Sequence, residues 1–132
     1  MCKNKLYRQN FEPILWTTSL HFLSLYFTMS NFYYSSIVIL STSSSIIWHR
    51  EYECSYNQYV LDYFFATLLT MFEIHNGNDK TFIIYANLFV FIVNKATDVL
   101  SSHKILKYTT AHSFFHIISS IKTIYISYKF SK

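Results

Sequence analysis

Two histidines lie four positions apart in the stretch TTAHSFFHII, residues 109–118. On an α-helix, side chains at positions i and i+4 lie on the same face, with their Cβ atoms about 6 Å apart. His112 and His116 are therefore placed to bind one metal ion together. The same spacing suits two histidines that only form hydrogen bonds inside a helix bundle, so the pair alone decides neither interpretation.

Three more polar residues complete a possible site. His49 ends a long apolar run, and Ser45, four residues before it, lies on the same helical face. Asp62 opens the next apolar run. Neutral imidazole is a preferred zinc ligand, and a catalytic zinc site has three protein ligands and an open position for water. The candidate zinc ligands are His49, His112 and His116, and the candidate catalytic residues are Asp62 and Ser45.

The segments that carry these residues are long and apolar. From Pro13 through His49 there is no Asp, Glu, Lys or Arg, a run of 37 residues. One membrane span needs about 20 residues, so this run is long enough for two spans with a turn at Ser30 and Asn31. Hydrophobic residues make up 52% of the chain and charged residues only 14%. The sequence predicts an all-α, polytopic membrane helix bundle that forms one domain, residues 1–132.

Five transmembrane segments are expected, at residues 14–30, 32–49, 57–75, 81–99 and 108–128. Successive spans alternate in direction, so the end of the second and the starts of the third and fifth lie near the same membrane surface. At 1.5 Å per residue, the three candidate ligands and Asp62 fall within roughly 10 Å of that surface. Lys122 lies late in the fifth segment, where its long side chain is expected to reach outward.

Polar groups are expensive inside a membrane, so histidine and aspartate at this depth are candidate functional groups. A zinc ion would polarise a substrate carbonyl and lower the pKa of a bound water to about 7, and Asp62 could accept a proton from that water. The alternative is structural, with histidines that pack between helices and an aspartate that complements a helix dipole. His21, His75 and His103 are assigned to packing or to loops.

Three motifs in this order resemble those of the CREST superfamily of membrane hydrolases. They are SIIWH (residues 45–49), YNQYVLDYFFATLLTMFEI (residues 56–74) and HSFFH (residues 112–116). The second stretch is most similar to the branch that contains myomaker and the transmembrane-protein-eight proteins. The shared pattern is S-x-x-x-H at the end of one helix, an Asp that opens the next, and H-x-x-x-H in the last helix.

The resemblance implies a zinc ion bound by His49, His112 and His116. It also implies that Asp62 and Ser45 contact the metal-bound water or the oxyanion, and that the substrate is an amide or ester of a lipid. The chain departs from the family in helix number, because the family has seven helices. Three of those lie between the Asp helix and the last helix, whereas only one fits between them here.

Three functions remain open at the level of sequence. The first is a zinc-dependent intramembrane hydrolase that acts on a lipid or a lipid anchor. The second is a non-enzymatic multi-pass membrane protein, myomaker-like or structural, with a polar layer between its helices. The third is a small pore formed by a homo-oligomer. Membrane lipid is the expected partner, and nucleic acid is not, because the net charge of +4 comes from scattered lysines without a basic cluster.

Overall fold

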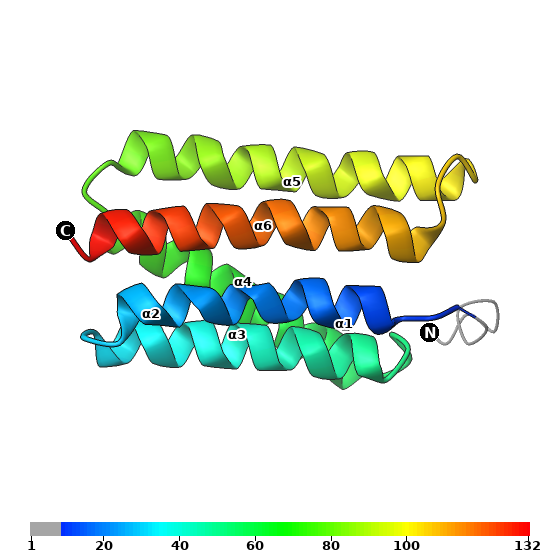
Figure 1. Ribbon diagram of the computed structural model, residues 1–132, viewed down its shortest axis with the longest axis horizontal. Helices are drawn as coiled ribbons and strands as arrows, with labels where there is room; N and C mark the ends of the chain where they lie inside the picture. The colour runs from blue at the N-terminus through cyan, green and yellow to red at the C-terminus, as the bar shows by residue number, and fades with distance from the viewer. Residues whose placement is uncertain (1–8) are drawn as a thin grey trace.

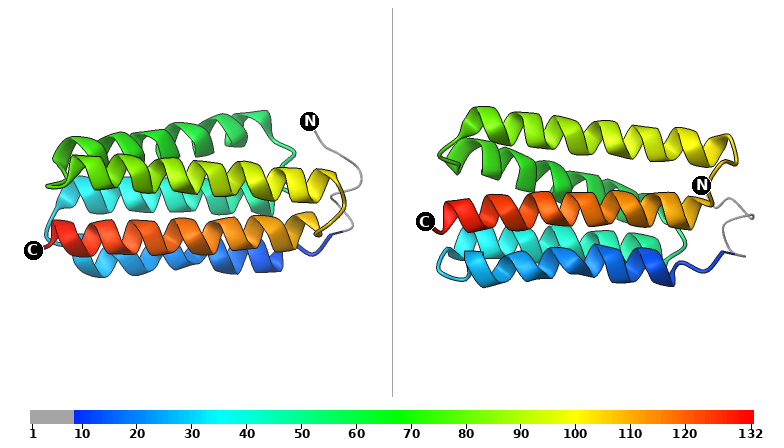
Figure 2. Two further views of the ribbon diagram at one scale, coloured as in Figure 1. Left: turned by 90° about the horizontal axis from the view of Figure 1, so that it is seen from above. Right: turned by 45° about the horizontal axis from the view of Figure 1, so that its top comes forward.

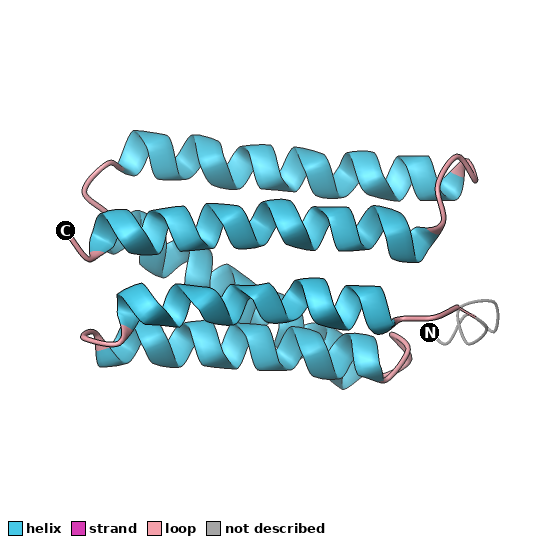
Figure 3. Cartoon of the chain, in the orientation of Figure 1, coloured by secondary structure: helices cyan, strands magenta, loops and turns pink. Residues whose placement is uncertain are grey.

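The computed structural model describes residues 9–132, and within this range the chain is helical without any β-strand (Figures 1 and 3). α1 (Glu12–Ser19), the 3-10 helix η2 (Leu20–Ser24) and α2 (Leu25–Thr28) follow one another without a break as one helical segment. The remaining helices are α3 (Phe32–Arg50), α4 (Tyr56–Asn76), α5 (Lys80–Ser102) and α6 (Tyr108–Phe130). The all-α fold is confirmed, and each of the five segments begins and ends within three residues of the expected position.

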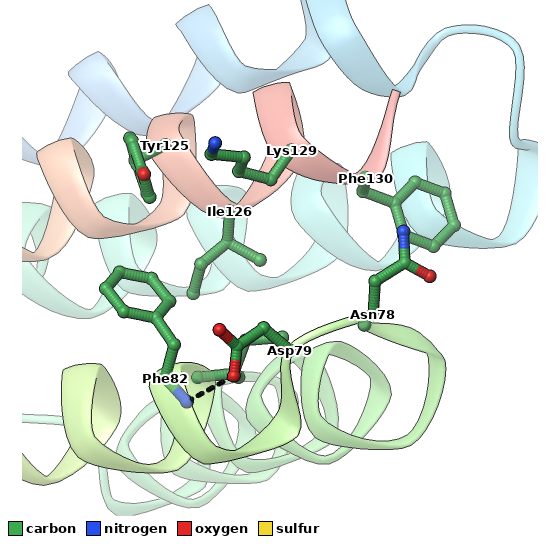
Figure 4. A pocket seen from close by; sticks show the side chains of 9 residues that line it. Asn78, Asp79, Phe82, Tyr125, Ile126, Lys129 and Phe130 are labelled. Atoms are coloured by element: carbon green, nitrogen blue, oxygen red, sulfur yellow. Dashed lines mark hydrogen bonds between the residues drawn. The ribbon is translucent and has the colours of Figure 1, made fainter. Parts of the chain in front are cut away.

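Polar side chains define where three of these helices begin. Asn31 caps α3 by accepting a hydrogen bond of 2.9 Å from the backbone N–H of Tyr34. Asp79 caps α5 in the same way, with a bond of 2.9 Å from Phe82 that is drawn in Figure 4. Ser55 occupies the equivalent position before α4. Asn, Asp and Ser are favoured at this position because their side-chain oxygens satisfy N–H groups that lack a partner within the helix.

Helix α6 lies at the centre of the arrangement. It packs against α5 on one side and against α1, η2 and α2 on the other, while α3 packs mainly against α4 and α1 (Figure 1). The start of α1 and the C-terminus lie at opposite ends of the bundle (Figure 1). Helices α4 and α5 are adjacent at their connecting turn and splay apart toward the other end (Figure 2), so they contact each other far less than α5 contacts α6.

The turn between α4 and α5 requires a glycine for steric reasons. A Cβ atom at Gly77 would overlap Cδ1 of Ile83 and would lie 2.7 Å from the backbone oxygen of Glu73. Real Cβ atoms do not approach backbone oxygens so closely, so only Gly allows the two helices to meet here. Beside this turn, Phe82 and Asp79 face the end of α6 across a small cavity of about 250 Å³ (Figure 4).

Much of the interior is polar, and much of the exterior is apolar. Buried side chains on α3 and α6 are mostly Ser, Thr and His, and several hydroxyls bond to the carbonyl four residues earlier, as Ser120 does to His116 at 2.7 Å. Large apolar side chains point outward on every helical segment. Tyr26, Phe32 and Trp16 are 79%, 76% and 70% exposed. Soluble monomers rarely expose apolar side chains on this scale, whereas membrane helices use small residues where they pack together.

One helix of the described residues, α5, is long and apolar enough to cross a membrane by length and composition. The sequence predicts five such helices, so the multi-pass topology is not confirmed and stays a prediction. In the first segment, α1, η2 and α2 are each too short, and α3, α4 and α6 carry many Ser, Thr, Tyr and Asn side chains, which lower the mean hydropathy. In α3 and α6 many of these polar side chains are buried between helices.

Candidate metal centre

Three histidines from two helices meet at one end of the bundle. His49 is the second-last residue of α3, and His112 and His116 lie in the first half of α6. One ring nitrogen from each can be chosen so that all three atoms lie within 4.8 Å of one another, which is close enough to hold a metal ion. The predicted grouping of these three side chains is confirmed. The two α6 histidines meet because of their i, i+4 spacing, and antiparallel packing brings His49 beside them.

The geometry of the rings suits a shared ligand. Nε2 of His49 lies 3.0 Å from Nε2 of His116. The ring of His112 lies 4.9 Å from that of His49 and 4.8 Å from that of His116, measured between centroids. Zinc–nitrogen bonds of 2.0–2.1 Å in a tetrahedral site place two ligand nitrogens about 3.3 Å apart. The separation of the His49 and His116 nitrogens is therefore close to the spacing of two ligands on one ion.

The hydrogen bonding of these rings is incomplete, which also fits a metal centre. Nδ1 of His112 and Nδ1 of His116 are buried and have no hydrogen-bond partner among the described residues. Buried polar atoms without a partner are rare and costly in folded proteins. A group of three imidazoles that can each offer one nitrogen to a shared point matches the ligand set of catalytic zinc sites. The residues present therefore fit the predicted zinc ion.

A carboxylate that the sequence analysis missed holds the third histidine in place. Oε1 of Glu53 lies 2.9 Å from Nδ1 of His49 and accepts a hydrogen bond of 2.6 Å from the hydroxyl of Tyr108. Burial raises the pKa of the Glu53 carboxyl, but the hydrogen bonds from His49 and Tyr108 outweigh it and hold the pKa below its usual range. An ionised carboxylate only accepts hydrogen bonds, so Nδ1 of His49 carries the hydrogen that points to Glu53, and Nε2 faces the other two histidines.

An unusual backbone turn brings Glu53 back under the His49 ring. Tyr52 and Glu53 have φ values of 53° and 58°, in the left-handed region that non-glycine residues rarely adopt. The N–H of Glu53 bonds to the carbonyl of Trp48 at 3.1 Å, which closes the turn directly after α3. Such conformations cost energy and gather at functional sites.

Asp62 and Ser45 lie in the same cavity as the histidines. This cavity has a volume of about 570 Å³, and it extends from the three rings along the inner faces of α4, α5 and α6. Asp62 lies within interaction range of Ser45 and His49. Neither residue belongs to the group of three ligands, so both are placed beside the candidate metal position rather than on it.

The other histidines lie in two different environments. His75 and His103 are exposed at the ends of α4 and α5. His21, assigned to packing or to loops, packs against α6 and also lines the cavity, and its ring lies 6.1 Å from that of His116. Its Nε2 lies 3.1 Å from the hydroxyl of Ser119. No spacing in the sequence connects His21 to the other histidines, so only the packing of the first helical segment against α6 reveals it.

Comparison of the chain with protein-family models, with curated proteins and with solved structures finds no match.

Proposed function

We propose that this protein is a multi-pass membrane hydrolase that cleaves an amide or ester bond of a lipid or a lipid anchor, with zinc as its cofactor, and that it is a short relative of the CREST superfamily. The observation that carries the proposal is the group of three buried histidines at the wall of a large cavity, with Asp62 and Ser45 beside them. A site with three protein ligands leaves one position open, as catalytic zinc requires and structural zinc does not.

The distribution of apolar side chains supports a membrane location. Large hydrophobic residues are exposed on every helical segment, while many Ser and Thr side chains, two histidines and Glu73 are buried between helices. An apolar exterior of this extent is unfavourable in water and favourable in contact with lipid. The cavity also reaches the outer surface between α4 and α5, because Tyr63, Met71 and Phe91 line it and are 52%, 63% and 56% exposed. A lipid chain could therefore enter from the side.

The chain supplies separate groups for the separate tasks of hydrolysis. A zinc ion, when bound, supplies Lewis acidity and an activated water. We assign to Asp62 the role of taking a proton from the nucleophile and returning it to the leaving group. The hydroxyl of Ser45 hydrogen-bonds to Asp62 in the structure, and in the proposed reaction it would turn to donate to the oxygen that becomes negative as the carbonyl is attacked. Glu53 keeps the lone pair of His49 pointed at the centre, as carboxylates do for metal-binding histidines.

Metal analysis of the detergent-purified protein tests this function first. We expect one zinc per chain after expression with sufficient zinc, and loss of the metal when His49, His112 or His116 is replaced by Ala. Removal of one of three imidazoles leaves two ligands, which hold the ion poorly. His75→Ala is the matched control, because His75 is exposed and lies outside the group. Absence of zinc from the native protein, or equal loss from the control, would contradict the proposal.

A non-enzymatic membrane protein is the second candidate. It is favoured by one observation, a buried hydrogen-bonded chain of Tyr34, Glu73 and Lys122 that joins α3, α4 and α6. Such a layer holds helices together without any chemistry. The zinc analysis separates the two candidates, because only the hydrolase requires a metal at the three histidines.

A further inference from the structure

A buried ion pair lies further along the bundle from the histidines. Nζ of Lys122 lies 2.8 Å from Oε2 of Glu73, and their side chains are 9% and 0% exposed. Nζ also donates a hydrogen bond of 3.0 Å to Oδ1 of Asn87. The expected outward reach of Lys122 is therefore wrong. Its ammonium group lies inside the bundle, because Glu73 compensates its charge there.

The two members of the pair differ in what they face. Lys122 and Asn87 line the large cavity, whereas Glu73 does not. The carboxylate of Glu73 is enclosed, and its second oxygen accepts a hydrogen bond of 3.3 Å from the hydroxyl of Tyr34. The pair therefore presents its positive end to the cavity and its negative end to the protein. The ammonium group has three N–H donors, and the two hydrogen bonds above use two of them.

We propose that Lys122, with Asn87 beside it, forms a binding site for an oxygen-bearing polar group of a lipid, such as a carboxylate or a hydroxyl. This inference rests on the proposed function for the class of ligand and adds a second point of attachment. Lys122 follows His116 by six residues on α6, a rise of about 9 Å along the helix axis. A ligand with a carbonyl at the histidines could thus place a second oxygen near the ammonium group.

The chemistry of the cavity wall favours an oxygen acceptor over a hydrocarbon at this position. Thr70 and Ser119 also line the cavity near Lys122, but Thr70 already donates a hydrogen bond of 3.4 Å to Oδ1 of Asn87, and the hydroxyl of Ser119 lies 3.1 Å from Nε2 of His21. The third N–H of the Lys122 ammonium group is therefore the donor on which the site depends. A free donor of a buried ammonium group gains most from a charged or strongly polar acceptor. A hydrocarbon chain would leave that donor without a partner, at a cost similar to that of a lost hydrogen bond.

Binding of a photoreactive palmitate to the full-length chain in dodecyl maltoside tests the site. The experiment uses the His116→Ala background, so that a carboxylate cannot be held by zinc. We expect palmitate to bind in this background, and Lys122→Met to weaken its binding about ten-fold or more, as for the loss of a hydrogen bond to a charged group. The matched control is Lys95→Met, because Lys95 pairs with Asp98 but is 58% exposed and does not line the cavity.

Two further measurements keep the result interpretable. If Lys122→Met does not fold, the double variant Glu73→Gln/Lys122→Met removes both charges of the pair. This variant should fold, and it should bind palmitate more weakly than the His116→Ala background does. A photoreactive hexadecane without oxygen should bind equally to all folded variants. Equal palmitate binding by the Lys122 and Lys95 variants, or no palmitate binding in the background chain, would overturn the proposal. Neither outcome bears on the zinc content of the native protein, which tests the hydrolase separately.

Discussion

The imidazole of His49 is oriented by contacts on both of its nitrogens. Glu53 lies 2.9 Å from Nδ1, and His116 lies 3.0 Å from Nε2. The same carboxylate accepts a hydrogen bond from Tyr108, whose ring stacks on that of His112 at 5.1 Å. One side chain thus links the turn after α3 to the start of α6, and both helices carry candidate ligands. Replacement of Glu53 should therefore change the affinity for a metal ion through the orientation of the His49 imidazole.

Replacement of Glu53 should weaken the metal centre without removing it. We expect Glu53→Gln to lower zinc affinity by about 10–100-fold, because the loss of such a partner frees the ring of His49 to rotate or change tautomer. Glu53→Asp should restore part of the affinity. Competition with a chromophoric zinc chelator measures the change. Glu51→Gln is the control, since Glu51 is exposed in the same turn, and an equal effect there would point to general disruption.

Asp62 and Ser45 should affect turnover more than metal content. Both line the cavity, but neither belongs to the three-ligand group. We expect Asp62→Asn to keep most of its zinc and to lose at least 100-fold in the rate of lipid hydrolysis, because proton transfer contributes about 10²–10⁴-fold. Ser45→Ala should be milder, since Ser44 and Thr42 are close in sequence. Loss of zinc from Asp62→Asn equal to that from His116→Ala would instead make Asp62 a ligand.

The site could be predicted from the sequence only where its residues follow regular spacing. His112 and His116 share a face because they are four apart, and alternation of helix direction brings His49 to the same depth. Glu53 could not be found this way. It lies in a turn with a left-handed backbone conformation, and no pattern in the sequence predicts that conformation. Lys122 was placed wrongly because its partner Glu73 lies 49 positions away, on another helix.

At the scale of helices, the sequence locates elements better than contacts between them. The run without charged residues and the capping residues Asn31, Ser55 and Asp79 are local features, and they mark the helix ends within a few residues. The splaying of α4 from α5 is not local, and no spacing predicts it. It matters because the cavity reaches the surface between these two helices.

Gly77→Ala tests how tightly the turn between α4 and α5 is packed. A Cβ there would meet Cδ1 of Ile83 and the backbone oxygen of Glu73, which already accepts a hydrogen bond of 2.9 Å from the Gly77 N–H. We expect a loss of about 1–3 kcal/mol in the free energy of unfolding. Thermal unfolding in detergent measures it, with Asn78→Ala at the exposed neighbour as the control. Addition of Ile83→Val should recover part of the loss, and no loss at all would mean that the turn is looser than described.

At the scale of the molecule, burial runs opposite to that of a protein dissolved in water. Polar groups such as the pair of Glu73 and Lys122 lie inside, while Tyr26 and Phe32 point outward. The mean hydropathy of a helix averages over its buried and its exposed face. By helix length and mean hydropathy, α5 is the one described helix that could cross a membrane. The three-dimensional arrangement shows separately which face of each helix is buried and which is exposed. The proposed multi-pass location would account for both faces, whereas a single span through α5 would leave the other exposed apolar residues in water.

Five spans require the two ends of the described chain to lie on opposite sides of the membrane. The structure places the start of α1 and the C-terminus at opposite ends of the bundle, and it places the α4–α5 turn at the C-terminal end (Figure 1). We therefore expect single cysteines at Asn10 and Ser131, in a chain whose native cysteines are serine, to react with impermeant maleimide from opposite sides of sealed vesicles. Asn78→Cys should react from the same side as Ser131→Cys. Labelling of Asn10 and Ser131 from one side would require an even number of spans. That result would overturn the proposed five-span topology.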